Sequence, residues 1–138
     1  MPLQRTGRDN IAKLITSTGS MRPWSATGAY FLVGNSTVAH GSSSTWLLGA
    51  LSTMKAMNSG WPVYISGLNT TSGIIYEFQA TFQTSEAAFA WAEWGIGNST
   101  STGDASVSLL NRKQEDPSLG TKSTAAIWQV SSQITFTT

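Results

Sequence analysis

The strongest pattern in the chain is an alternation of apolar and polar residues in the stretch IIYEFQATF, residues 74–82. Every second residue is apolar, so one set of side chains would lie on one face of a strand and the other set on the opposite face. The apolar set consists of Ile74, Tyr76, Phe78, Ala80 and Phe82. Residues 128–136 repeat the pattern, with Trp128, Val130, Ile134 and Phe136 on the apolar side. Both segments are predicted to be long antiparallel strands with one face in the core.

Shorter strands are predicted at three other places. Residues 29–33, AYFLV, are an apolar run bounded by glycines. Residues 62–67, PVYISG, follow a break at Gly60, and residues 107–113, VSLLNRK, lie between two polar stretches. Runs of this length, bounded by Gly, Pro, Asn and Ser, are typical of strands.

The segments between these strands are less clearly patterned. Residues 46–57, WLLGALSTMKAM, are ambiguous, because their apolar residues fit one face of a helix whereas Gly49 weakens a helix. Residues 34–46, 98–106 and 114–124 are predicted to be loops, since they are rich in small polar residues and glycine.

The N-terminal segment carries the only helical signal that stands without a competing pattern. In residues 6–20, TGRDNIAKLITSTGS, Ile11, Leu14 and Ile15 would lie on one helical face. Gly19 would end the helix. We therefore expect residues 1–20 to form an arm with one short helix, and residues 21–138 to form a single domain.

Together these elements indicate a mainly β protein. Several strands separated by turns, without alternation of strands and helices, are typical of an antiparallel β-sandwich or barrel-like domain. Only 11% of the residues are charged, and the remaining polar residues are mostly Ser and Thr. Uncharged polar outer faces favour packing against neighbouring subunits.

Charge and composition exclude several classes of function. The net charge is +1, which gives no basic surface for nucleic acid or an anionic membrane. No apolar run approaches the length of a membrane span or a signal-peptide core. The chain has no Cys and one His, so we expect no disulfide, no metal site and no cofactor. Four basic residues gather near the N-terminus: Arg5, Arg8, Lys13 and Arg22. They either belong to a solvated chain end, which is the simpler interpretation, or make the arm a candidate for contact with an acidic partner surface.

The one stretch that suggests chemistry is SEAAFAWAEWGIGN, residues 85–98, in which Glu93 lies within two residues of Trp91 and Trp94. A glycosidase needs two carboxylates beside the scissile bond, and Glu86 is the second candidate, with the tryptophans available for stacking on a sugar. The structural alternative is a buried Glu93 that fixes a turn and is satisfied by backbone N–H groups or by Arg112. We favour the structural alternative.

On that interpretation the tryptophans are anchors of the core or of a subunit interface. Trp91, Trp94 and Trp128 all lie in apolar surroundings in the sequence. Trp94→Ala would then cost about 3–5 kcal/mol of folding free energy. The single histidine, His40, has no nucleophile motif beside it. We expect no enzymatic activity.

Several stretches in the second half of the chain resemble a family of small phage virion structural proteins. This family includes head decoration (cement) proteins and tail-fibre-type N-terminal modules. The matching elements are residues 80–82, 86–87, 93–98, 109–112, 122–123 and 128–136. The front half of the chain resembles the family pattern more weakly, in the stretches TGRDNIAKLI and YFLVGNST. Gly97 departs from the pattern, as does the longer loop GNSTSTGDASVS.

The resemblance implies a virion protein that works by binding. It would be made in the cytoplasm of a bacterial host and be located on the capsid surface, with the major capsid protein as its partner. Family members are commonly trimeric or otherwise multimeric, so a homo-oligomer is expected. The arm, residues 1–18, would reach across seams between capsomers. The alternative is a tail, baseplate or fibre-anchoring module, and a carbohydrate-binding module is a third, less favoured hypothesis.

Overall fold

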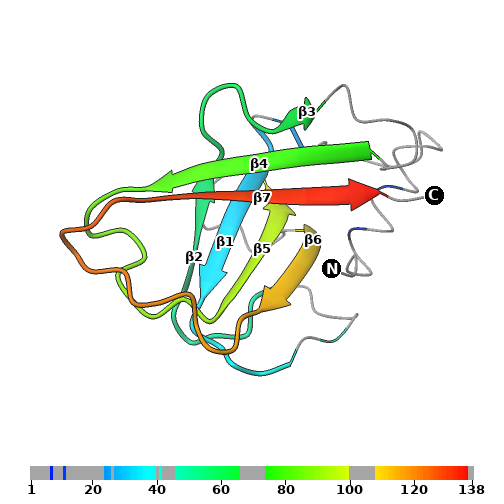
Figure 1. The fold of residues 1–138 in the computed structure, drawn as a ribbon. Coiled ribbons are helices and arrows are strands. Elements are labelled where there is room, and N and C mark those ends of the chain that lie inside the picture. The colour runs from blue at the N-terminus through cyan, green and yellow to red at the C-terminus, as the bar shows by residue number, and fades with distance from the viewer. Residues whose placement is uncertain are drawn as a thin grey trace.

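The structure is a computed structural model that describes residues 7, 11, 24–25, 27–39, 41, 46–65, 74–99 and 108–136. Its described part contains seven strands in two antiparallel sheets (Figure 1). None of the helices in the described part is both long enough and apolar enough to span a membrane.

The first sheet has four strands in the order β2-β1-β5-β6. They are β1 (Ala29–Gly34), β2 (Ser52–Ala56), β5 (Glu93–Asn98) and β6 (Ser108–Gln114). All six residues of β1 are buried, as expected for a central strand with both faces covered.

The second sheet has three strands in the order β3-β4-β7. They are β3 (Val63–Ile65), β4 (Ile74–Phe82) and β7 (Trp128–Phe136). β4 and β7 pair along their whole length, from Ile74 opposite Phe136 to Phe82 opposite Trp128. In Figure 1 these two strands run across the strands of the first sheet.

The two sheets share one hydrophobic core. Phe31 and Val33 of β1 and Ile96 of β5 belong to the same buried cluster as Phe78 of β4 and Ile134 of β7. A second, smaller cluster lies on the opposite face of the first sheet and includes Tyr30, Leu32, Leu47, Met54 and Leu109. The first sheet is therefore covered on both faces, by the second sheet on one side and by the β1–β2 connection on the other.

The predicted strands at 29–33, 74–82 and 128–136 are confirmed. Within the described residues, the strands predicted at 62–67 and 107–113 correspond to β3 (Val63–Ile65) and β6 (Ser108–Gln114). The ambiguous segment 46–57 is not helical: it is irregular up to residue 51 and then forms β2. One side chain of the predicted inner face differs from the prediction, because Tyr76 is 40% exposed. Tyr76 packs against Tyr64 of the short strand β3, with ring centroids 5.6 Å apart, at the end of the sheet.

The turn that the sequence analysis associates with Glu93 is not present there, because Glu93–Asn98 form strand β5 in the middle of the first sheet. Glycine normally weakens a strand, but here it permits close approach of the neighbouring backbone. A Cβ atom at Gly95 would lie 2.4 Å from the carbonyl oxygen of Asn111 in β6. The pairing of β5 with β6 shifts register between Ile96 and Gly97, which marks a β-bulge at this point.

The expected helix in residues 6–20 lies outside the described residues, apart from Gly7 and Ile11, and is not supported. These two residues lie against the domain. A Cβ atom at Gly7 would come within 2.7 Å of the Leu110 backbone, and Ile11 packs against the shared core.

Candidate functional site

Glu93 and Arg112 form a buried ion pair on the face of the first sheet that is turned away from the second sheet. Glu93 is the first residue of β5, and Arg112 lies on the neighbouring strand β6. Arg112 Nε donates to Glu93 Oε2 over 2.6 Å, and both side chains have no exposed surface. The pair is the centre of a buried polar cluster.

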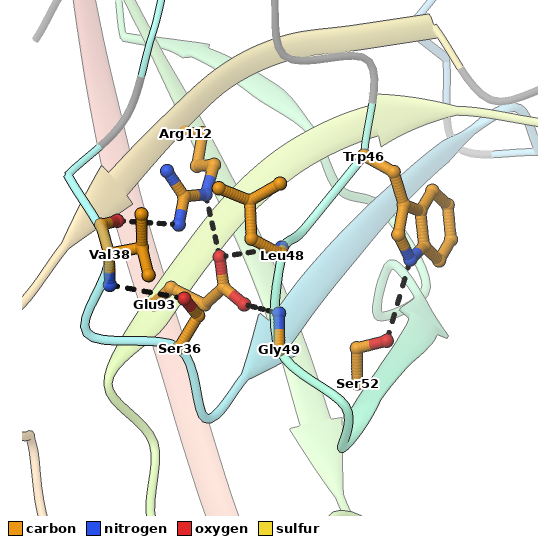
Figure 2. Close-up of polar contacts among 8 residues, drawn as sticks. All are labelled: Ser36, Val38, Trp46, Leu48, Gly49, Ser52, Glu93 and Arg112. Carbon is orange, nitrogen blue, oxygen red and sulfur yellow. Dashed lines mark hydrogen bonds and ion pairs between the residues drawn. The ribbon is translucent and has the colours of Figure 1, made fainter.

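The carboxylate is also bonded by backbone N–H groups (Figure 2). Leu48 N donates to Oε2 over 3.1 Å, and Gly49 N donates to Oε1 over 2.6 Å. The sequence left two partners open for Glu93, the backbone or Arg112, and the structure contains both. A buried carboxylate requires such partners, because an unpaired charge in the interior is strongly destabilising.

The guanidinium extends the cluster to a second segment. Arg112 Nη2 donates to the carbonyl oxygen of Val38 over 3.0 Å. Its Nη1 is buried and has no hydrogen-bond partner in the described part of the chain. The ion pair thus joins both described ends of the β1–β2 connection, residues 35–39 and 46–51, to the central strands.

Further hydrogen bonds hold the same connection. Asn35 N donates to the carbonyl oxygen of Leu51 over 3.0 Å, and Leu51 N donates to Asn35 Oδ1 over 3.0 Å. Trp46 Nε1 donates to Ser52 Oγ over 3.4 Å. The connection is therefore a well-bonded layer over the sheet.

Two glycines leave room for the carboxylate. A Cβ atom at Gly34 would lie 2.5 Å from Glu93 Oε1, and one at Gly49 would lie 2.9 Å from the same oxygen. In the sequence, Gly34 indicates only the end of a strand, and Gly49 indicates only that a helix would be weakened there. Their role depends on contacts between segments far apart in the sequence, which local patterns do not contain.

The three tryptophans predicted as anchors lie toward the other face of the first sheet. Trp91 is fully buried, and its ring meets the rings of Phe82 and Trp128 edge-on, each at a centroid distance of 4.9 Å. Its Nε1 donates to the carbonyl oxygen of Ala87 over 2.9 Å. Trp94 is only partly buried and stacks on Phe31 with centroids 5.6 Å apart.

Trp91 and Trp94 line an apolar groove of about 250 Å³. Glu93 does not line it, because successive residues of a strand point to opposite faces. The carboxylate at the groove is Glu115, which accepts hydrogen bonds from Trp94 Nε1 over 2.8 Å and from Lys113. Partial burial raises the pKa of Glu115, but the hydrogen bonds from Lys113 and Trp94 outweigh it, so that its pKa lies below the ordinary value.

Glu86, the second acid of the glycosidase hypothesis, is engaged elsewhere. Lys55 Nζ donates to both of its carboxylate oxygens, over 2.6 and 2.8 Å. Glu86 lines a separate groove together with Lys55 and Met54 of β2. The arrangement required by that hypothesis, with Glu86 and Glu93 beside the tryptophans, is not assembled.

Lys122, for which the sequence indicated no role, is almost completely buried. Its Nζ donates to the carbonyl oxygen of Gln83 over 2.7 Å and so joins the β6–β7 connection to the end of β4. Burial of a lysine beside a polar turn has no signature in the local sequence.

The four basic arm candidates Arg5, Arg8, Lys13 and Arg22, as well as His40, lie outside the described residues. Among the described residues, no group of three or more His, Cys, Asp or Glu could hold a metal ion.

Comparisons with protein-family models, curated proteins and solved structures find no significant match for this chain.

Proposed function

We propose that the protein is a structural component of a bacteriophage particle. In this proposal a β-sandwich domain binds the outside of the capsid as a decoration protein and bridges neighbouring major capsid subunits. The sequence resemblance described above suggests this class of function. The structural observation that carries the proposal is a set of exposed apolar side chains on the β1–β2 connection.

Val38, Leu48 and Leu51 are 60%, 51% and 52% exposed. Their backbone groups are nevertheless fixed. Val38 O and Leu48 N are bonded to the buried ion pair (Figure 2). Leu51 N is bonded to Asn35. A contact surface held in this way loses little conformational entropy when it binds. Exposed apolar side chains that are held in place are typical of protein–protein contact surfaces.

The mechanism would be adhesive. The apolar side chains of the connection would be removed from water against the capsid, at about 25 cal/mol for each Å² of apolar surface. Many copies, each bridging two capsid subunits, would offset the outward pressure of packaged DNA. The low charge of the chain, 11% of residues, suits such contacts because few charges must be desolvated.

The first experiment is the copy number of the protein in purified particles, measured by quantitative mass spectrometry. A decoration protein is expected in hundreds of copies per particle, and particles that lack it are expected to lose DNA at lower temperature. A few copies located at the tail would contradict the decoration role and favour a tail or baseplate module. Unchanged heat resistance of particles that lack the protein would also contradict it.

A binding experiment tests the surface itself. Leu48→Ser combined with Leu51→Ser should weaken binding to undecorated shells without lowering the melting temperature of the free protein. Tyr64→Ser is the matched control, because Tyr64 is also exposed, at 56%, but lies on the other sheet. Full binding by the Leu48 and Leu51 variant would exclude the β1–β2 connection as the contact surface.

A further inference from the structure

Strand β7 is an unprotected sheet edge in the described part of the chain. It pairs with β4 on one side, and no described strand pairs with its other side. Such an edge presents unpaired backbone N–H and C=O groups to any strand that approaches. Proteins usually protect a long edge with charged side chains, proline, a bulge or a short strand.

None of these devices is present in β7. Its nine residues, WQVSSQITF, include no charged residue and no proline, and its pairing with β4 is regular throughout. The other three edges of the described sheets differ. β3 has three residues, β2 carries Lys55, and β6 carries Lys113 and a bulge in its pairing with β5.

An apolar groove runs beside the free side of β7. Val130 and Ser131 of β7 line it together with Trp94 and the loop residue Leu119, and none of its lining residues comes from β4. Leu119 is 54% exposed. A strand added to the β7 edge would cover this groove, so pairing would bury apolar surface as well as satisfy backbone groups.

We propose that β7 pairs antiparallel with β7 of a second copy of this chain, about a two-fold axis at Ser132. This register places Val130 opposite Ile134 of the second copy on the inner face. On the outer face it places Gln129 opposite Thr135 and Ser131 opposite Gln133. Apolar residues thus meet apolar residues and polar residues meet polar ones. No two charges of the same sign face each other, so the surface is complementary to itself, as an isologous interface requires.

The outer-face side chains are compatible with this pairing. Gln129 Nε2 donates to Gln79 Oε1, and Gln133 Nε2 donates to Glu77 Oε2, so both are directed toward β4. Neither covers the free edge. Pairing of two copies through β7 does not depend on a role in a virion.

The test uses two matched variants of the full chain, both of which carry Gln133→Lys. The double-lysine variant adds Ser131→Lys, which places two lysines opposite each other, twice per dimer. The charge-paired variant adds Ser131→Glu, which places a glutamate opposite each lysine instead. Positions 131 and 133 are exposed in the single chain, so both variants should fold equally well.

Sedimentation across a dilution series should show a dimer for the wild-type chain. The double-lysine variant should dissociate with a Kd about tenfold higher than that of the charge-paired variant. A monomeric wild-type chain would overturn the proposal. Equal association of the two variants would overturn it as well, even if the chain is oligomeric.

Cross-linking gives a second readout, because the chain has no native cysteine. Directly opposed residues of an antiparallel pair have Cα atoms about 4.5–5.5 Å apart, which suits a disulfide. Ser132→Cys should therefore form a covalent dimer on mild oxidation. Thr135→Cys, which is more exposed but lies off the axis, should form much less. The reverse order of yields would overturn the register.

Discussion

Glu93 and Arg112 lie 2.6 Å apart, with both side chains completely buried, and they join two strands to the connection that covers them. The pair has the Leu48 and Gly49 N–H groups on one side and the Val38 carbonyl on the other. Its location explains why a low-charge protein keeps this pair of charges in its interior. They fix the backbone of a surface segment whose side chains are apolar and exposed.

Glu93→Gln is expected to lower the free energy of unfolding by about 3–5 kcal/mol, because it leaves the Arg112 charge buried without a counter-ion. Urea denaturation followed by tryptophan fluorescence measures this change. Glu77→Gln is the matched control, since Glu77 lies on the outer face of β4 and accepts a hydrogen bond from Gln133 at the surface. The control should change stability by no more than about 0.5 kcal/mol.

The coupling between the two residues can be measured directly. In a double-mutant cycle with Glu93→Gln and Arg112→Met, the double variant should be more stable than the sum of the single effects predicts. A coupling of about 1–3 kcal/mol is expected for residues in contact. Additive effects would show that the pair does not act as a unit.

Gly95→Ala is expected to destabilise the protein by about 2–3 kcal/mol, because the new methyl group would meet the backbone of Asn111 at 2.4 Å and backbone cannot move aside easily. Gly60→Ala is the control. Gly60 has a φ of +84°, but no atom lies within 4 Å of the position that a Cβ would take, so only the conformational cost of about 1 kcal/mol applies. Equal losses in thermal unfolding would contradict the close approach of β5 and β6.

Elements whose pattern lies within a single segment could be predicted from the sequence. β4 and β7 were predicted because the alternation of apolar and polar residues is contained within each strand. β5 was not, because the glycines in EWGIGN suggest a turn until the backbone of β6 is placed beside them. The pairing of β5 with β6 is a contact between two separate segments, and the pattern within one segment does not contain it.

The candidate site shows the same difference between features that a local pattern predicts and features that depend on contacts between segments. The sequence predicts Arg112 as one of two alternative partners of Glu93, because a buried carboxylate needs a hydrogen-bond donor. The Leu48 and Gly49 N–H groups were not identified, since residues 46–57 had no clear pattern. The sequence also does not distinguish the two tryptophans of the motif, which are expected as anchors of the core or of a subunit interface: Trp91 is fully buried, whereas Trp94 is partly exposed.

The larger loss of stability is therefore expected at Trp91. Trp91→Ala removes edge-on contacts with Phe82 and Trp128 and should cost about 3–5 kcal/mol. Trp94→Ala removes one stacked contact with Phe31 at a partly exposed position and should cost about 1–3 kcal/mol. Thermal unfolding of the two variants measures the difference. A greater loss for Trp94→Ala would contradict the placement of the two rings.

The pairing of Glu86 with Lys55 predicts a dependence of stability on pH. Hydrogen bonds from Lys55 and from the Gln83 N–H group lower the pKa of Glu86. A carboxylate whose pKa is lower in the folded than in the unfolded state stabilises the fold above its unfolded pKa of about 4.3. That contribution is lost as the pH falls through the folded-state pKa. Wild-type protein should therefore be more stable than the Glu86→Gln variant at neutral pH.

The melting temperatures of these two proteins should converge once the pH falls below the folded-state pKa of Glu86, where its carboxylate is protonated. The effect is modest, because the Glu86 side chain is 39% exposed and solvent screens the pair. Lys55→Met tests the assignment. In the Lys55→Met background, Glu86→Gln should change the melting temperature much less at neutral pH. A difference between wild type and Glu86→Gln that persists unchanged into acid would show that the loss comes from packing rather than from the charge of Glu86.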